Sequence, residues 1–201
     1  MQLIIISGPS GSGKTTLSEI IIKKIEDGII LNTDNYYRKG ILSTILSKIV
    51  TSYFDRKISF NLKLFKKDIE FILKNGFSNL SYQYDFKNQS IKKILKKTSN
   101  IRFIIVEGIF GKEIFNFLSS KNFILIKLEV NKQYCMNRVI KRDVMERGKS
   151  KDLAKKDFIK AWNLFYKNEK KNNSRKYLKK FVLKDKRQIK DLLCQISKLL
   201  T

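Results

Sequence analysis

The sequence of 201 residues has no histidine, one proline and two cysteines, and it contains no long run of apolar residues. Cys135 and Cys194 lie far apart and lack metal-ligand spacing, so we expect free thiols in a reducing compartment. Because Pro9 is the one proline and no linker divides the chain, we expect a single domain over residues 1–201. The apolar runs are too short for a membrane span, and the N-terminal run is too short for a signal peptide. These absences favour a cytoplasmic globular protein.

Acidic residues are also scarce, since 18 aspartates and glutamates face 43 lysines and arginines and the formal net charge is +25. Such a cationic surface attracts nucleotides, nucleic acids or acidic membranes. The lysines are spread along the whole chain among many isoleucines and asparagines, which indicates a general residue bias at solvated positions. A nucleic-acid footprint would gather on one face or in one motif, and the densest run, residues 167–176, is equally typical of a polar loop. We therefore expect neither nucleic acid nor membrane as a partner.

The first sixteen residues carry the clearest signal. Residues 3–6 (Leu-Ile-Ile-Ile) predict a buried strand, and residues 8–15 then complete the phosphate-loop pattern G-x-x-x-x-G-K-[ST]. An amphipathic helix follows directly, as this motif requires. The residues predicted to bind the nucleotide are Gly8, Pro9, Ser10, Gly11, Ser12, Gly13, Lys14, Thr15 and Thr16.

Each part of this loop has a physical task. Glycines allow the backbone to wrap closely, so that successive N–H groups point at phosphate oxygens, and the helix N-terminus adds its positive dipole. Lys14 is expected to reach the β- and γ-phosphates, and the hydroxyl of Thr15 is expected to bind Mg²⁺. The loop therefore predicts a protein that binds a nucleoside triphosphate.

The rest of the chain alternates apolar strands with amphipathic helices. Strands are predicted at 28–32, 101–106, 123–128 and 178–183, and helices at 41–50, 61–75, 131–147, about 150–168 and 189–200, with a short helix around 114–118. The helix ending near 168 is expected to bury Leu153, Phe158, Ala161, Trp162 and Phe165. Residues 77–97 fit either irregular structure or short strands. This alternation predicts an α/β fold with three layers, α/β/α, around a mostly parallel sheet.

Two acidic residues follow predicted strands, as the phosphate loop does. In parallel sheets ligands bind at the carboxyl ends of the strands, where Asp34 and Glu107 are expected to lie. Asp34 is suited to take the proton of an attacking hydroxyl group, and Glu107 to orient Mg²⁺. Either acid alone could be a helix cap or a turn residue, but their joint placement beside a phosphate loop favours catalysis.

The basic helix at 131–147 could provide a lid over residues 131–150. Arg138 and Arg142 lie four residues apart and therefore share a face, while Arg147 can join them only if the helix ends there. Arginines on a closing lid would neutralise the phosphates and exclude water. The competing interpretation is ordinary surface pairing, because Arg142 and Glu146 are also four residues apart.

Several segments together resemble the uridine kinase and phosphoribulokinase family of P-loop kinases, and most closely its uridine kinase members. The resemblance extends from residue 4 to about residue 182 and rests on short segments. Besides the loop, these segments are Asp34-Asn35-Tyr36-Tyr37, Tyr53-Phe54-Asp55, Tyr84-Asp85-Phe86, Val106-Glu107-Gly108-Ile109 and Arg142-Asp143-Val144-Met145-Glu146-Arg147-Gly148-Lys149. It implies a nucleoside kinase-like P-loop fold with a helical lid.

The resemblance also implies roles for the acceptor site. By it, Asp34 is the catalytic base and Tyr37 lies near the nucleoside, Asp55 holds the ribose hydroxyls, and Tyr84 and Phe86 line the pyrimidine pocket. Lys14, Arg142 and Arg147 would stabilise the transferring phosphoryl group. Related kinases often form homo-oligomers, although no stretch of this sequence identifies an interface.

The sequence departs from the family pattern in the part that reads the base. Gln89 stands where the family has histidine, Ile91 where it has arginine, and residues 56–59 replace the usual continuation after the ribose-binding Asp. Gln89 still offers a donor and an acceptor to a pyrimidine edge. Lys149 replaces the last lid arginine, which keeps the charge and loses the bidentate fork.

The residues and the resemblance together predict an ATP- and Mg²⁺-dependent kinase that phosphorylates a small metabolite, uridine or cytidine at the 5′-hydroxyl. Another acceptor, such as ribulose 5-phosphate or pantothenate, stays open because of the departures above. The sequence also leaves open a nucleic-acid-binding NTPase and a family member that binds ATP without turnover. A guanine-specific switch protein is not expected, since the sequence has no N-K-x-D segment.

Overall fold

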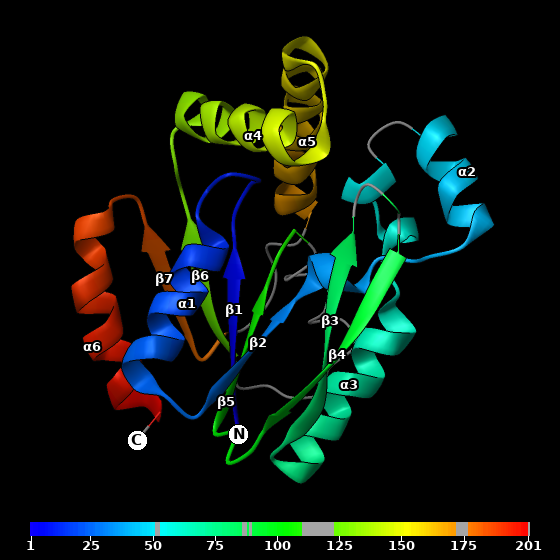
Figure 1. Ribbon diagram of the computed structural model, residues 1–201. Helices are drawn as coiled ribbons and strands as arrows, with labels where there is room; N and C mark the ends of the chain where they lie inside the picture. Colours follow the sequence, from blue (N-terminus) through cyan, green and yellow to red (C-terminus); the bar gives the residue numbers. More distant parts are fainter. Residues whose placement is uncertain (51–52, 86–87, 89, 110–122, 172–176, 201) are drawn as a thin grey trace.

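The computed structural model describes residues 1–50, 53–85, 88, 90–109, 123–171 and 177–200. A five-stranded parallel sheet lies at the centre of this part of the chain (Figure 1). In spatial order its strands are β2 (Gly28–Asn32), β5 (Phe103–Glu107), β1 (Gln2–Ser7), β6 (Phe123–Leu128) and β7 (Lys179–Leu183). The predicted parallel sheet is confirmed.

The central strands are those with the longest runs of β-branched residues. Every residue of β5 is buried, and so is every residue of β1 after the first. A strand covered on both faces reads as a continuous apolar run rather than as an alternating one. The isoleucines of these two strands therefore place them in the middle of the sheet.

The register of the sheet determines which strand ends lie beside one another at its rim. Glu107, at the end of β5, pairs with Ile6 of β1 on one side and with Asn32 of β2 on the other. The loop after β1 and the 3-10 helix η1 (Thr33–Tyr36) after β2 therefore leave the sheet at the same rim as Glu107. The predicted meeting of the three strand ends is confirmed.

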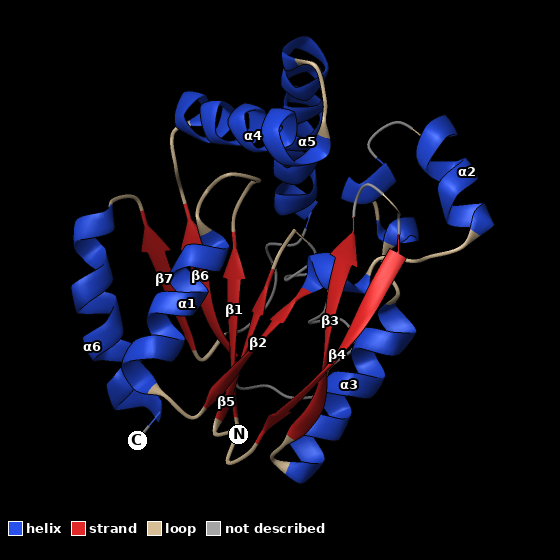
Figure 2. Cartoon of the chain, viewed as in Figure 1, coloured by secondary structure: helices blue, strands red, loops and turns tan. Residues whose placement is uncertain are grey.

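Helices cover both faces of the sheet, as the three-layer prediction requires (Figure 2). On one face, α1 (Lys14–Ile25) and α6 (Ile189–Leu200) pack through Leu17, Ile21, Leu192 and Ile196 against Ile4, Ile6 and Ile105. On the other face, α3 (Leu62–Asn75) packs through Phe65, Ile69 and Ile72 against Leu3, Ile5 and Val106. The alternation of residues along each strand supplies the two apolar faces.

The strands β3 (Ser78–Asp85) and β4 (Ser90–Thr98) pair antiparallel as a hairpin, where the sequence left short strands and irregular structure open. Tyr82 and Tyr84 are buried, while Gln83 between them is exposed. The rings of these tyrosines meet Tyr36 and Tyr37 edge-on, with centroids 5.3 and 5.2 Å apart. Aromatic contacts therefore attach the hairpin to the segment that follows β2.

The predicted helix at 41–50 is present as α2 (Ile41–Ile49), but its largest apolar side chains are exposed. Ile41 is 82% exposed and Ile49 73% exposed. The buried contact comes instead from Ser43, whose hydroxyl lies 3.0 Å from the hydroxyl of Tyr53 in the short helix η2 (Tyr53–Asp55). Figure 1 shows α2 projecting away from the sheet.

Two helices, α4 (Lys132–Arg147) and α5 (Lys151–Lys171), stand above the carboxyl rim of the sheet (Figure 2). Phe158 is buried as expected, and Ala161, Trp162 and Phe165 are half-buried. The expected burial of Leu153 is wrong, since it is 47% exposed and the neighbouring Ala154 is buried instead. The short helix expected around 114–118 lies outside the described residues. Across the described part of the chain, every helix is too short or too polar to cross a membrane.

Candidate active site

The phosphate loop joins β1 to α1 and folds over the sheet rim. Gly11 and Gly13 have φ angles of 81° and 93°, which favour glycine. A Cβ atom on Gly11 would also lie 2.6 Å from the carbonyl oxygen of Cys135 in α4. Gly11 is thus required both by its backbone conformation and by the close approach of α4, and Gly13 by its backbone conformation. All nine residues predicted to bind the nucleotide lie in this loop and in the first turn of α1.

Lys14 lies inside the loop rather than in solvent. Its Nζ donates hydrogen bonds to the carbonyl oxygens of Gly8, at 3.0 Å, and Pro9, at 3.1 Å. Burial lowers the pKa of Lys14 below its ordinary value, and the negative charges of Glu107 and Asp34 oppose this shift. The three charges therefore occupy one site, and the lysine is held by weak neutral acceptors that phosphate oxygens could replace.

Glu107 and Thr15 face each other across the rim. The hydroxyl of Thr15 donates a hydrogen bond of 2.9 Å to Oε1 of Glu107, which is 1% exposed. Burial raises the pKa of Glu107, and Lys14 and the Thr15 hydroxyl offset part of this rise. A hydroxyl and a carboxylate oxygen are ligands that Mg²⁺ accepts, so the pair fits a Mg²⁺ site completed by phosphates and water.

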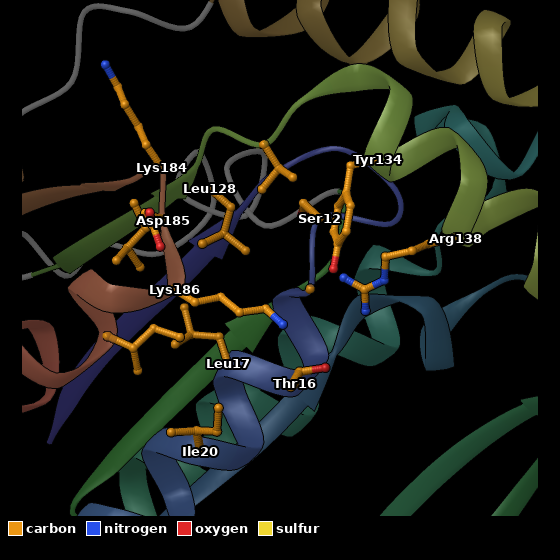
Figure 3. Close-up of a pocket in the computed structure, with 14 residues that line it drawn as sticks. Ser12, Thr16, Leu17, Ile20, Leu128, Tyr134, Arg138, Lys184, Asp185 and Lys186 are labelled. Carbon is orange, nitrogen blue, oxygen red and sulfur yellow. The ribbon is translucent and has the colours of Figure 1, made fainter.

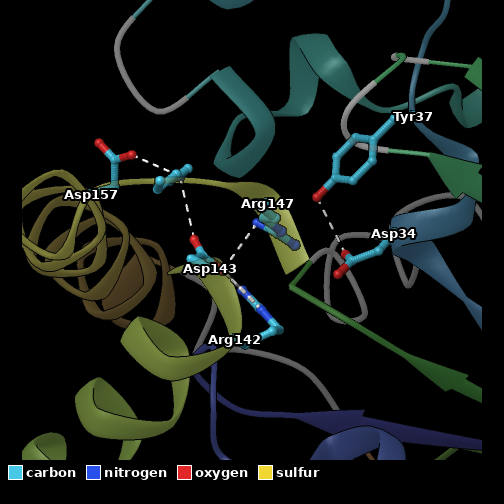
Figure 4. Close-up of polar contacts among 7 residues, drawn as sticks. Asp34, Tyr37, Arg142, Asp143, Arg147 and Asp157 are labelled. Carbon is cyan, nitrogen blue, oxygen red and sulfur yellow. Dashed lines mark hydrogen bonds and ion pairs between the residues drawn. The ribbon is translucent and has the colours of Figure 1, made fainter. Parts of the chain in front are cut away.

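Asp34 occupies η1, directly after β2. The side chain of Asn32 caps this turn, because its Oδ1 accepts a 2.7 Å hydrogen bond from the backbone N–H of Asp34. The hydroxyl of Tyr37 donates to Oδ1 of Asp34 at 3.3 Å (Figure 4). Residues close to it in sequence thus orient the carboxylate of Asp34, which lies at the same rim of the sheet as the phosphate loop.

The arginines of α4 converge on the same region. Arg142 donates from Nε and Nη2 to Oδ1 of Asp143, at 2.9 and 2.8 Å, and Arg147 lies 3.6 Å from the same oxygen. Burial lowers the pKa of Arg147, as does the charge of Arg142, whereas Asp143 and Asp34 act in the opposite direction. Figure 4 shows Arg147 between Asp143 and Asp34. The helix does end at Arg147, and the ion pair that the structure shows for Arg142 is with Asp143.

Asp143 itself was not predicted to be a functional residue. Burial alone raises its pKa, but the charges of Arg147 and Arg142 outweigh burial and hold the pKa below its ordinary value. A signal was present in the sequence, since Asp143 follows Arg142 and precedes Arg147 by four residues. The sequence could not show that the carboxylate is buried.

The depressed pKa of Asp143 makes stability depend on pH. The folded protein binds this proton less readily than the unfolded chain, whose aspartates titrate near a pKa of about 3.9, so the carboxylate stabilises the fold above that pH. We expect Asp143→Asn to lower the free energy of unfolding by about 2 kcal/mol at pH 7. The difference in the free energy of unfolding between the wild type and Asp143→Asn should become smaller as the pH falls below about 4.

Urea denaturation at a series of pH values from 7 to 3 measures this difference. Asp152→Asn, at an exposed acid in the first turn of α5, is the matched control and should cost well under about 1 kcal/mol. A gap between the wild type and Asp143→Asn that stays constant down to pH 3 would contradict the assignment of this pKa shift.

A cavity of about 630 Å³ lies beside the loop, between α1, the end of β6, α4 and the segment after β7 (Figure 3). Its apolar walls come from Leu17, Ile20, Leu128 and Leu183. On one side the guanidinium carbon of Arg138 lies 5.6 Å from the ring centroid of Tyr134. A planar, largely apolar ligand fits such walls.

The residues predicted to bind the acceptor are only partly described. Tyr37 and Tyr84 lie together with Phe54, with ring centroids 5.1 to 6.1 Å apart, close to Asp34. Burial, together with the neighbouring charge of Asp85, raises the pKa of Tyr84 to about 12. Phe86, Gln89 and the side chain of Asp55 lie outside the described part.

Asn35 is a further residue of this region that sequence reasoning missed. Its Oδ1 accepts a 3.2 Å hydrogen bond from the backbone N–H of Tyr84 and so joins the hairpin to the turn that carries Asp34. No pattern in the sequence relates these two positions, which are 49 residues apart.

The sheet order, the phosphate loop after β1 and the helices on both faces define a P-loop kinase fold. A solved structure described as a possible uridine kinase from Bacillus stearothermophilus shares this fold, with a TM-score of 0.55 and 15% identity over 90% of this chain and 88% of that one. The chain belongs to the phosphoribulokinase/uridine kinase family, whose model it matches over residues 3–169. It is an ATP-dependent kinase of that family.

The curated relatives agree with this assignment. The uridine kinase of Mycoplasma genitalium is 35% identical over 167 residues, which cover 80% of this chain and 73% of that protein. The uridine kinase of Clostridium novyi is 32% identical over 154 residues, which cover 75% of this chain and 72% of that protein.

Proposed function

We propose that this kinase transfers the γ-phosphoryl group of ATP to the 5′-hydroxyl of uridine or cytidine. The observation that carries the proposal is the convergence of Lys14, Asp34, the Thr15–Glu107 pair and Arg147 on one rim of the sheet. The names of the relatives, uridine kinases of two bacteria, support the pyrimidine nucleoside as acceptor.

The donor side of the reaction rests on the loop. The N–H groups of residues 8–16 would surround the phosphates, and Lys14 would exchange its two carbonyl acceptors for β- and γ-phosphate oxygens. Thr15 and Glu107 would hold Mg²⁺, which neutralises phosphate charge when it is bound. The base of ATP would occupy the cavity beside α1, between its apolar walls and the Tyr134–Arg138 pair.

The acceptor side rests on Asp34. Its carboxylate would accept the proton of the 5′-hydroxyl as the oxygen attacks the γ-phosphorus, while Tyr37 keeps the carboxylate oriented. Arg142 and Arg147, on a lid of residues 131–150 within a single domain, would stabilise the charge on the transferring group. Tyr84 and Tyr37 would face the nucleoside, together with Asp55, Phe86 and Gln89.

A panel of acceptors tests the proposal directly. The purified protein, supplied with ATP and Mg²⁺, is expected to release ADP with uridine and cytidine at least about tenfold faster than with ribulose 5-phosphate or pantothenate. Mass spectrometry should identify the nucleoside 5′-monophosphate. The same assay with RNA in place of an acceptor tests for a nucleic-acid-dependent NTPase, whose hydrolysis would rise with RNA and fall steeply with salt. Preference for an acceptor other than a pyrimidine nucleoside would contradict the proposal.

A further inference from the structure

The buried carboxylate of Asp143 lies among three positively charged side chains at the end of α4. Asp143 is 3% exposed, and its two carboxylate oxygens lie within 4 Å of three cationic side chains. Arg142 and Arg147 share Oδ1, at 2.8 and 3.6 Å, and Nζ of Lys149 lies 3.3 Å from Oδ2. Asp157 of α5 contacts Lys149 at 2.8 Å from the other side. Figure 4 shows this arrangement beside Asp34.

The position of Asp143 on its helix is one that an apolar residue would ordinarily occupy. Cys135, Val139 and Asp143 follow one another at intervals of four residues, all three are buried, and the first two pack with Phe158 of α5. Burying a carboxylate is costly, and ion pairs of this kind often stabilise a fold no better than apolar residues of similar size. Packing alone therefore does not account for an aspartate at this position.

Without the carboxylate of Asp143, the positive charges around it would repel one another. Arg142 and Arg147 lie near each other, and the charge of Arg142 disfavours the charged form of Arg147. A shared carboxylate offsets this repulsion and fixes the direction of both guanidinium groups. The backbone carbonyl of Asp143 also accepts hydrogen bonds from the N–H groups of Gly148 and Lys149, so the same residue ends the helix.

We infer that Asp143 is a positioning residue, whose carboxylate holds Arg142 and Arg147 side by side and directed toward the site of phosphoryl transfer. The inference rests on the proposed function in one respect, because it takes these two arginines to act on the transferring group. In this role Asp143 acts through the arginines rather than by touching the substrate. Small displacements of such groups have large effects on rate, since transition-state stabilisation depends on their geometry.

The test compares Asp143→Asn with Asp157→Asn, which removes a carboxylate from the same cluster but leaves the carboxylate between the two arginines in place. Asp143→Asn is expected to lower kcat about 30-fold and to raise the KM for ATP about fivefold. Asp157→Asn should change both by less than about twofold. Assays are run well below the unfolding temperature of each variant, so that lost stability does not appear as lost turnover.

A double-mutant cycle with Arg147→Ala separates positioning from a purely structural role. If Asp143 acts through the arginines, the double variant should lose clearly less kcat than the product of the two single losses. A lower unfolding temperature of Asp143→Asn with unchanged kcat, or losses in kcat that multiply fully in the double variant, would overturn the inference.

Should Asp143→Asn fail to fold, Asp143→Glu keeps the charge and moves it by one methylene group. A folded Asp143→Glu with reduced kcat supports the inference, and wild-type kcat overturns it.

If the proposed function is wrong, these assays give a different set of results. A wild-type protein that phosphorylates another acceptor contradicts the pyrimidine assignment, and the Asp143 comparison is then made with that acceptor. If the wild type turns over no acceptor, calorimetric titration with ATP and Mg²⁺ decides the inference. An ATP affinity about fivefold weaker for Asp143→Asn than for Asp157→Asn supports it, and equal affinities overturn it.

Discussion

Asp34→Asn is expected to reduce phosphoryl transfer about 10³-fold while leaving ATP binding nearly unchanged. The substitution preserves the shape of the side chain, its cap by Asn32 and an acceptor for the Tyr37 hydroxyl. It removes the group that we propose takes the proton of the acceptor hydroxyl. The phosphate loop and Glu107 lie on neighbouring strands and do not depend on that side chain for their own hydrogen bonds.

Turnover is measured by ADP release with uridine, and ATP binding by calorimetry. Asp27→Asn provides the matched control, because Asp27 is an exposed aspartate just before β2, at the opposite end of the strand from Asp34. This control should retain wild-type turnover. Retained turnover in Asp34→Asn, or loss of ATP binding together with turnover, would show that Asp34 is not the base.

The second large effect is expected from Lys14→Met. Turnover should fall about 10²- to 10³-fold, because the ammonium group would no longer stabilise the phosphates. ATP should bind about 10-fold more weakly or worse, since a charge-assisted hydrogen bond is lost. Unlike most substitutions of buried residues, this one should leave the midpoint of thermal unfolding within about 4 °C of the wild type. The cost of burying the ammonium group outweighs its attraction to Glu107 and Asp34, so removing it relieves about as much as it loses.

Calorimetry with ATP and Mg²⁺, together with a thermal melt of the free protein, checks both halves of this prediction. Lys23→Met, at an exposed position in the last turn of α1, is the control for removing one lysine from a chain of net charge +25. It should bind ATP as the wild type does. Wild-type ATP affinity in Lys14→Met would contradict the assigned contact with the phosphates.

Much of the fold followed from local patterns. The isoleucine runs of β1 and β5, the phosphate loop between β1 and α1, and the apolar stripe of α6 could each be recognised within a window of about twenty residues. The shared rim of Asp34 and Glu107 could also be deduced, because parallel strands end together wherever helices connect them. These features depend on short-range periodicity and on general topology.

Other features depend on contacts between distant segments. Leu153 and Ala154 are neighbouring apolar residues of α5, and the helical pattern did not show which one the fold would bury. The apolar stripe of α2 predicts a helix, but nothing in a stripe says whether another element covers it. The hairpin β3–β4 gave a mixed signal because its outward positions carry lysines and its inward ones carry tyrosines that pack on Tyr36 and Tyr37.

The class of protein could be recognised from residue order, because a strand, a phosphate loop and a helix in direct succession specify a nucleotide site through local backbone geometry alone. How the arginines of α4 are organised around Asp143 became clear only from the folded chain. Asp143 continues the buried stripe of Cys135 and Val139, which packs on Phe158 of α5. Its cationic neighbours, in contrast, come from α4 itself and from Lys149 just after it. Electrostatic energies depend on distance and burial, and residue order encodes neither of them directly.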